Sequence, residues 1–194
     1  LHHCNFGKDD EYFDDAVSVV KKFQSDGKVK YLGLSDWSSK RILRYAIQFD
    51  PDIIQPYHNV MDDNYSTSGL KDFINDNNLG VCFFSPLKHG LLTGKYSTPI
   101  TFETGDHRSN IKDFQDLQIL HRLKRNKLLL EKRFQLQKNP VLYGLVNSLF
   151  LESNTSCVLL GQRNKAQVKA ACLLGDLISE NDAMWVKNLN NVNS

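Results

Sequence analysis

Apolar residues along the chain switch repeatedly between helical spacing and short continuous runs. Spacing at i, i+3, i+4 and i+7 predicts amphipathic helices. They fall at about residues 13–27, 39–50, 70–78, 117–136, 140–151 and 165–177, with a further short helix at 181–189. Continuous apolar runs predict strands at 29–34, 53–56, 81–84 and 156–160. Helix and strand therefore alternate over most of the chain.

The second predicted helix shows how the boundaries are assigned. Ser38 or Ser39 supplies a hydroxyl that can cap its N-terminus. The expected apolar stripe consists of Ile42, Leu43, Ala46 and Ile47. Pro51 disfavours helical backbone at the residue before it, so the helix is expected to end at about residue 50.

Short connections between alternating helices and strands require parallel strands with right-handed crossovers. An open doubly wound sheet and a closed (β/α)8 TIM barrel both satisfy this requirement. A nucleotide-binding open sheet carries Gly-x-Gly-x-x-Gly after its first strand, and this α/β sequence has no such motif. Ser35, Gln55, Ser85 and Gly161 instead follow or end the predicted strands, where a barrel builds its site. We therefore favour the barrel, with residues 1–194 in a single domain.

One segment departs from the alternating pattern. Residues 88–114 contain glycines, threonines, one proline and charges with little periodicity. A loop of this length is uncommon in a compact domain unless it has a function. We therefore expect it to be a candidate lid over a bound cofactor.

The charge balance excludes some classes of partner. The chain has 24 basic and 22 acidic residues, interspersed, so no overall field favours a nucleic acid or an anionic membrane. The local basic cluster at 121–133 is interrupted at helical spacing by apolar residues, which is typical of the solvated face of an amphipathic helix. These residues are Leu120, Leu123, Leu130 and Phe134. No apolar run approaches the roughly 20 residues that cross a bilayer, and a cytoplasmic protein is expected.

The four cysteines are too sparse for a disulfide scaffold in a chain of this length. Cys82 and Cys157 lie in apolar runs, so we expect them to be small buried hydrophobic residues with reduced thiols. A metal site at His2-His3-Cys4 is disfavoured, because adjacent strand residues point to opposite faces and no second ligand pair lies at zinc spacing. No metal is therefore predicted.

Four motifs carry the chemistry. They are Gly33-Leu34-Ser35-Asp36-Trp37-Ser38, Ile54-Gln55-Pro56-Tyr57, the segment Phe84 to Tyr96, and Leu160 to Gln167. None holds a nucleophile with a matched base, and Ser85 precedes a proline rather than lying in a Gly-x-Ser-x-Gly elbow, so hydrolysis is poorly supported. Their donors and acceptors suit a carboxamide and phosphates, which is sufficient when a cofactor brings its own reactivity.

In this order and spacing the four motifs resemble the nicotinamide half of an aldo-keto reductase. The resemblance extends over about residues 1–177 and is greatest to the branch that includes bacterial stress-type reductases and potassium-channel β subunits. It implies a (β/α)8 barrel represented by its second half, about strands 4 to 8, with the N-terminal part missing. It also implies an NADP(H)-dependent oxidoreductase that reduces a small-molecule aldehyde or ketone to an alcohol.

The resemblance also assigns roles to individual residues. His2 would be the catalytic histidine that orients the carbonyl. Ser35, Asp36 and Gln55 would face the nicotinamide carboxamide, and Phe84 would stack on the nicotinamide ring. The pyrophosphate and the adenosine end would be held by Ser85, Pro86, Leu87, Gly90, Lys95, Arg108, Gly161, Arg163 and Gln167, with Arg163 suited to a 2′-phosphate.

Departures from the family pattern leave three hypotheses open. Asp36 stands where many members have asparagine or arginine, Phe84 where many have tyrosine, and Ala170 and Ala171 where an acidic residue and an asparagine commonly close on the adenine. The catalytic aspartate, tyrosine and lysine belong to the first three strands, which this chain lacks. The chain is then the cofactor-binding part of a reductase, or a non-catalytic NADP(H)-sensing or interaction protein or inactive gene fragment. Alternatively, it is a half-barrel completed by a second copy or by a separate N-terminal half.

Overall fold

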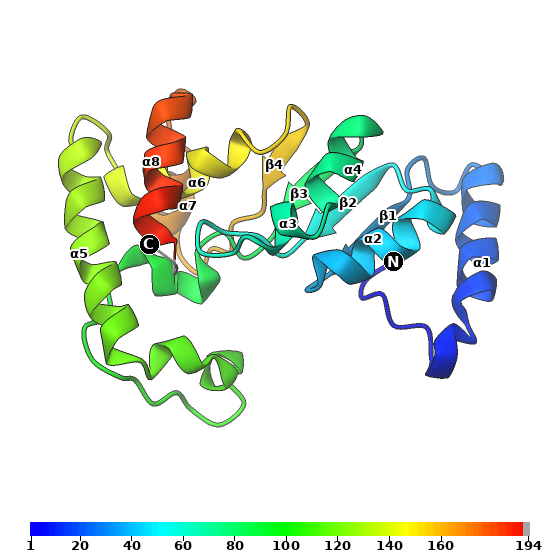
Figure 1. Ribbon diagram of the computed structural model, residues 1–194, viewed down its shortest axis with the longest axis horizontal. Helices are drawn as coiled ribbons and strands as arrows, with labels where there is room; N and C mark the ends of the chain where they lie inside the picture. The colour runs from blue at the N-terminus through cyan, green and yellow to red at the C-terminus, as the bar shows by residue number, and fades with distance from the viewer. Residues whose placement is uncertain (192–194) are drawn as a thin grey trace. The chain divides into compact units, whose positions relative to one another are not determined.

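Four short strands form one sheet in the order β1-β2-β3-β4 in the computed structural model, which describes residues 1–191 (Figure 1). They are β1 (Gly33–Asp36), β2 (Ile53–Pro56), β3 (Gly80–Phe83) and β4 (Ser156–Val158). The β1–β2 and β2–β3 pairs are parallel, as the alternation with helices predicts. His2 forms an isolated parallel bridge with Ser35, which places the start of the chain beside β1.

Eight α-helices accompany the strands within residues 1–191. They are α1 (Phe13–Ser25), α2 (Ser39–Phe49), α3 (Asn64–Thr67), α4 (Leu70–Asp76), α5 (Leu117–Arg133), α6 (Pro140–Phe150), α7 (Lys165–Ala171) and α8 (Glu180–Asn190). The hydroxyl of Ser38 caps α2 by accepting from the backbone N–H of Arg41, and Asp116 caps α5. The loop at 88–114 contains three 3₁₀ segments, Lys88–Thr93, His107–Asn110 and Lys112–Phe114.

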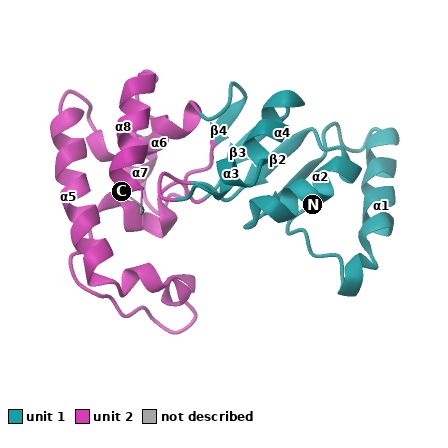
Figure 2. Ribbon diagram, viewed as in Figure 1, with its two compact units in different colours: residues 1–58, 62–84, 152–157 teal, residues 59–61, 85–151, 158–194 magenta. Residues whose placement is uncertain are grey.

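The chain divides into two compact units (Figure 2). Unit 1 comprises residues 1–58, 62–84 and 152–157, and unit 2 comprises residues 59–61, 85–151 and 158–194. In unit 1, α2 packs on β1 and β2, and α2 and α4 contact each other. In unit 2, α5, α6 and α8 pack on one another around a core that includes Leu120, Leu130, Leu145, Leu149 and Val186. Each unit therefore buries its own apolar residues.

A buried polar contact attaches residues 152–157 to unit 1. Glu152, almost fully buried, accepts a 2.8 Å hydrogen bond from the ammonium of Lys71, and its other oxygen lies 3.3 Å from the ring of His58. The hydroxyl of Thr155 donates to the backbone carbonyl of Leu79, the residue before β3. A buried carboxylate is costly unless it is paired, so these contacts hold the segment that leads into β4.

Several sequence predictions are confirmed. The strand predicted at 53–56 matches β2, and α5 begins at the predicted Leu117. Within α5 and its C-cap, Leu120, Leu123, Leu130 and Phe134 are buried. The basic cluster therefore lies on an amphipathic helix, as its spacing predicts. None of the helices in the described residues combines the length and the apolar character needed to cross a membrane.

Other predictions are wrong, and their errors have physical causes. The face of α2 that packs inward consists of Ile42, Tyr45, Ala46 and Phe49, whereas Ile47 is 72% exposed. The i, i+3, i+4, i+7 spacing selects Tyr45 and Phe49 and turns Ile47 away. The sequence predicts that Cys82 and Cys157 are buried, but Cys82 is half-buried and Cys157 is exposed, because a strand alternates its side chains between two faces and the face of β4 that carries Cys157 is left open to solvent. β1 begins four residues later than predicted, at Gly33, and α7 ends at Ala171 rather than 177.

Candidate functional site

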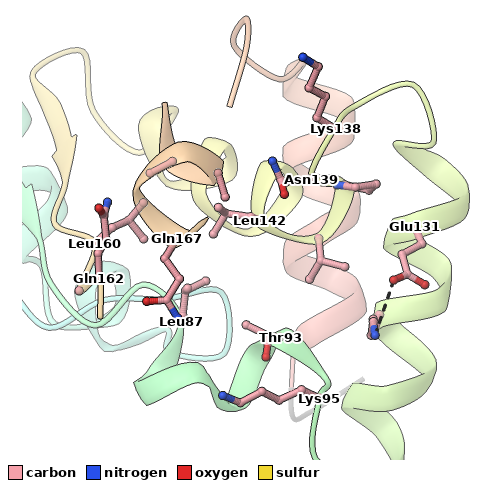
Figure 3. A pocket seen from close by; sticks show the side chains of 16 residues that line it. Leu87, Thr93, Lys95, Glu131, Lys138, Asn139, Leu142, Leu160, Gln162 and Gln167 are labelled. Carbon is pink, nitrogen blue, oxygen red and sulfur yellow. Dashed lines mark ion pairs between the residues drawn. The ribbon is translucent and has the colours of Figure 1, made fainter. Parts of the chain in front are cut away.

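Unit 2 contains a cavity of about 440 Å³ (Figure 3). Its lining comes from the loop after β3, from α5, from the start of α6 and from the segment that runs from β4 into α7. Four residues assigned to the cofactor from the sequence line it, namely Leu87, Lys95, Gly161 and Gln167. The cavity size is within the range that small ligands occupy.

The loop after β3 has an unusual backbone. Ser85, Lys88 and His89 all adopt positive φ, between 46° and 60°. Side chains in this left-handed region are uncommon, and they concentrate at functional sites. Three hydrogen bonds to backbone carbonyl oxygens hold the turn. The N–H of Lys88 donates to the carbonyl of Ser85, and the N–H of Gly90 donates to that of Leu87. The hydroxyl of Thr93 donates to the carbonyl of Gly90 at 2.7 Å. The structure therefore holds the predicted phosphate loop in a fixed turn.

Lys95 and Gly94 mark where this loop meets its surroundings. A Cβ added to Gly90 would lie 3.6 Å from the ammonium of Lys95, so the cation lies directly over the glycine turn. A Cβ added to Gly94 would lie 2.5 Å from the backbone oxygen of Leu123, so the loop approaches α5 too closely for any side chain there. Lys95 follows Gly94 directly and therefore lies where the loop approaches Lys127 of α5. Both lysines line the cavity.

The opposite wall begins with a reciprocal cap at the start of α7. Asn164 accepts from the backbone N–H of Gln167 at 3.0 Å, and Gln167 in turn accepts from the backbone N–H of Arg163 at 2.6 Å. This exchange resembles a capping box, shifted by one residue. The side-chain amide oxygen of Gln167 is thus engaged in fixing the turn, and the same side chain lines the cavity.

One carboxylate, that of Asp106, feels the charge of two predicted arginines. Arg108, in the candidate lid, hydrogen-bonds both oxygens of Asp106. These bonds, together with the nearby charge of Arg163, hold the pKa of that carboxyl well below its usual range. Arg108 therefore pairs with Asp106, and the charge of Arg163, 55 positions away in sequence, acts on the same carboxylate.

The other predicted residues lie in unit 1. Ser35 of β1 and Gln55 of β2 are direct register partners, and His2 bridges to Ser35 on the other side. His2, Ser35 and Gln55 thus form one row across three parallel segments, as their predicted strand-end positions require. Within the described residues, no group of three His, Cys, Asp or Glu side chains could hold a metal ion.

An aromatic cluster stands at the ends of the strands. The ring of Trp37 lies 5.1 Å from that of Tyr57 and 5.0 Å from that of Phe84, in an edge-to-face contact with Phe84. The sequence assigned a ring-stacking role only to Phe84. Trp37 and Tyr57 could have been identified from their position, because each of the three aromatics is the first residue after its strand. Trp37 is 44% exposed and offers a ring surface to a planar ligand.

Asp36 is placed differently from its neighbours in the motif. It is 3% exposed, and its two oxygens accept from the backbone N–H groups of Cys4 and Ser38, each at 2.8 Å. Arg41 lies 3.6 Å from the same carboxylate. Its contacts in the structure are therefore with its own chain, and its role toward a carboxamide stays a prediction.

The remaining predicted residues all lie in unit 2. They are Ser85, Pro86, Leu87, Gly90, Lys95, Arg108, Gly161, Arg163 and Gln167.

Sequence comparison places these features among known proteins. The profile of the Aldo/keto reductase family matches residues 1–173. An L-glyceraldehyde 3-phosphate reductase of Escherichia coli O157:H7 is 32% identical over 104 residues, which are 51% of this chain and 30% of the reductase. An NADP(+) aldo-keto reductase of Schizosaccharomyces pombe, yakc, is 29% identical over 101 residues, with coverage of 51% and 30%. The matched region thus spans about a third of each relative.

Structure comparison agrees with the sequence comparison. The glycerol dehydrogenase of Gluconobacter oxydans superimposes with a TM-score of 0.78 at 23% identity, over 94% of this chain and 55% of that enzyme. At this identity the likeness concerns the fold alone. The parallel sheet with its alternating helices is thus of the aldo-keto reductase type, and the chain spans about half the length of this neighbour.

Proposed function

Because the chain belongs to the aldo/keto reductase family, we propose that it is the NADP(H)-binding half of a reductase that converts aldehydes or ketones to alcohols. The supporting observation is the cavity of unit 2. Leu87 and Lys95 reach it from the loop after β3, and Gly161 and Gln167 reach it from the segment after β4. These are the segments that follow the carboxyl ends of two neighbouring strands, where a barrel binds its ligands.

The lining of the cavity suits the adenosine end of the cofactor. Leu142, Leu160, Ala170 and Ala171 offer apolar surface to a base, while the cations of Lys95, Lys127 and Lys138 are available to phosphates. Glu131 lies 3.7 Å from Lys127 and offsets part of this charge. The net positive lining favours a phosphorylated ligand. Arg163, which is exposed, would add the guanidinium that favours NADP(H) over NAD(H).

Unit 1 would serve the reactive end. The cofactor supplies a hydride to the carbonyl carbon when it is bound. Ser35 and Gln55, which are adjacent in the sheet, would donate to and accept from its carboxamide, and the Trp37, Tyr57 and Phe84 cluster would present a ring face to the nicotinamide. His2, next to Ser35 in the same row, would orient the carbonyl oxygen. The proton donor is assigned to the part of the barrel that the relatives have and this chain does not span.

A second function has support from Asp36. Its carboxylate is buried and accepts backbone hydrogen bonds, so it offers no amide donor to the carboxamide. A chain that binds NADP(H) without turnover, and reports the bound cofactor to a partner, would tolerate this arrangement. Binding of NADPH without aldehyde reduction, by the chain joined to the N-terminal half of a related reductase, would favour this second function. For either function we propose a cytoplasmic location.

Calorimetric titration of the full chain with NADPH tests the cofactor proposal. We expect binding, and we expect Lys95→Ala to raise the dissociation constant by about tenfold to a hundredfold, since a charge-assisted hydrogen bond contributes roughly 1.5–3 kcal/mol. Lys124→Ala is the matched control, because Lys124 is exposed on α5 and does not line the cavity. Absence of binding to the folded wild-type chain, or equal losses in the two variants, would contradict the proposal.

A further inference from the structure

Two histidines from separate parts of the candidate lid lie against each other. His89 belongs to the first 3₁₀ segment of the loop, and His107 begins the second. They are 18 positions apart in sequence, yet the centroids of their rings are 5.1 Å apart. His89 is half-buried and His107 is exposed, so a small ion in solution can reach the pair. Neither histidine has a role in the proposed cofactor site described above.

The loop that carries the two histidines has a small core of its own. Phe114 is fully buried, and its ring makes edge-to-face contacts with Tyr96 at 5.3 Å and with Phe102 at 5.0 Å. This aromatic core folds the two ends of the loop together. The contact between His89 and His107 is therefore part of a packed structure.

The charged residues next to the two histidines are already paired. Lys88, the neighbour of His89, donates a 2.6 Å hydrogen bond to Asp113. Arg108, the neighbour of His107, donates to both oxygens of Asp106. Two cations and two carboxylates cancel in net charge. The charge at the paired rings therefore depends on the protons that the histidines themselves carry.

The surroundings of His89 disfavour its charged form when no anion is present. Burial, and then the charges of His107 and Arg108, lower the pKa of His89 below its ordinary value. Lys88 acts in the same direction, and Asp106 acts against it. An anion beside the rings would oppose the nearby positive charges and favour the protonated form. Binding of an anion here is therefore coupled to uptake of a proton.

The backbone at His89 is also unusual. Lys88 and His89 both have positive φ, 46° and 56°, and such strained residues concentrate at functional sites. The ammonium of Lys95 lies over the adjacent Gly90 and adds a cation to this turn. Leu87 in the same turn lines the cavity of unit 2. The turn thus presents His89 in a fixed conformation, within the segment that the cofactor proposal already uses.

We propose that His89 and His107 form a proton-dependent binding site for phosphate groups. The contact between the rings, the cancelled charges around them and the strained turn carry this inference. Both nitrogens of a protonated imidazole donate hydrogen bonds, and charged donors bind phosphate oxygens strongly. Binding should therefore strengthen as the pH falls below 7. If the occupant is the pyrophosphate of NADP(H), the inference rests on the proposed function, whereas a free phosphate would use the same donors without it.

Proton NMR titration of the full chain between about pH 5 and 8 tests the site itself. Sulfate is the probe, because it resembles phosphate and keeps a constant charge over this range. The chain has six histidines, and only the ring resonances of His89 and His107 should respond to sulfate, relative to chloride at equal ionic strength. The titration of His89 should move to higher pH. His107→Gln and His89→Asn assign the two resonances, and asparagine is chosen at position 89 because it tolerates positive φ.

Calorimetric titration with NADP+ at about pH 8 and about pH 6 identifies the occupant. The 2′-phosphate of the cofactor itself titrates near pH 6, so the readout is a difference between chains. Lowering the pH should strengthen binding by about tenfold more in the wild type than in His107→Gln, the gain of one charge-assisted hydrogen bond. His121→Gln is the matched control, because His121 is exposed on α5 outside the candidate lid, and it should behave as the wild type does.

The wild-type NMR titration decides the question even if a variant fails to fold. Histidine resonances that do not respond to sulfate would overturn the inference, as would an equal response of all six. A selective response to sulfate without the pH effect on NADP+ binding would support the site and assign it to free phosphate. A selective response without any NADP+ binding would contradict the proposed function and leave the phosphate site standing.

Discussion

The carboxylate of Asp36 accepts a 2.8 Å hydrogen bond from the backbone N–H of Cys4, which lies 32 positions away in sequence. Its second oxygen accepts from the N–H of Ser38, the residue that caps α2. One buried side chain therefore links the N-terminal segment, the end of β1 and the start of α2. The contact shows that Asp36 has a structural role even if it also faces the cofactor.

Replacement of Asp36 by asparagine should destabilise the chain. The amide keeps one acceptor oxygen and places an N–H₂ group against the other backbone N–H, which leaves a buried donor without a partner. We expect Asp36→Asn to lower the free energy of unfolding by about 1–3 kcal/mol, measured by urea denaturation. Asp76→Asn, at the exposed end of α4, should change it by less than about 0.5 kcal/mol. Equal stability of the two variants would show that the Asp36 contacts contribute little.

Cys4 should make stability depend on pH in the alkaline range. Burial, and then the charge of Asp36, raise the pKa of its thiol to about 12 from an ordinary value near 9. Between these values the unfolded chain loses the Cys4 proton while the folded chain keeps it, so stability falls as pH rises from about 9 to 12. Cys82 has a similar shift, so Cys4→Ala should reduce this slope without abolishing it. Parallel pH profiles for the variant and the wild type would contradict the assignment.

Features that depend on the local pattern of residues can be predicted from the sequence. Features that depend on contacts between residues far apart in the chain cannot. β2 is found because its apolar run is bounded by Pro51, and the row of Ser35 and Gln55 follows from placing each residue at a strand end. The inward turn of Tyr45 and the exposure of Cys157 depend on which face the rest of the chain covers. No local pattern carries that information.

The same division applies to the candidate site. Lys95 and Gln167 are found because their motifs resemble those of a family. Lys127 and Lys138 are missed, since many lysines occupy solvated helix faces and the sequence does not show which of them converge on one cavity. The contact of Asp36 with Cys4 is missed for the same reason. A carboxylate at a strand end suits a ligand and a backbone N–H equally well.

Gly94 should tolerate no side chain. It has a φ of 63°, and an added Cβ would lie 2.5 Å from the backbone oxygen of Leu123 and 2.8 Å from the Cβ of Lys127. We expect Gly94→Ala to lower the free energy of unfolding by more than about 2 kcal/mol, from backbone strain and from displacement of α5. Gly105→Ala is the control, because its φ is 88° and nothing lies within 4 Å of an added Cβ. The difference between the two variants isolates the steric overlap, and equal losses would refute it.

Ala171 should limit the affinity for the cofactor. Ala170 and Ala171 line the cavity with methyl groups where the family resemblance expects an acidic residue and an asparagine. We expect Ala171→Asn to lower the dissociation constant for NADPH about threefold to tenfold, because one added hydrogen bond contributes roughly 0.5–1.5 kcal/mol. Ala166→Asn is the matched control, since Ala166 is exposed on α7 and does not line the cavity. Both substitutions exchange the best helix former for a poorer one, so they share any loss of helix stability and differ only in access to the ligand. Calorimetric titrations of the two variants that coincide would show that the base does not bind against α7.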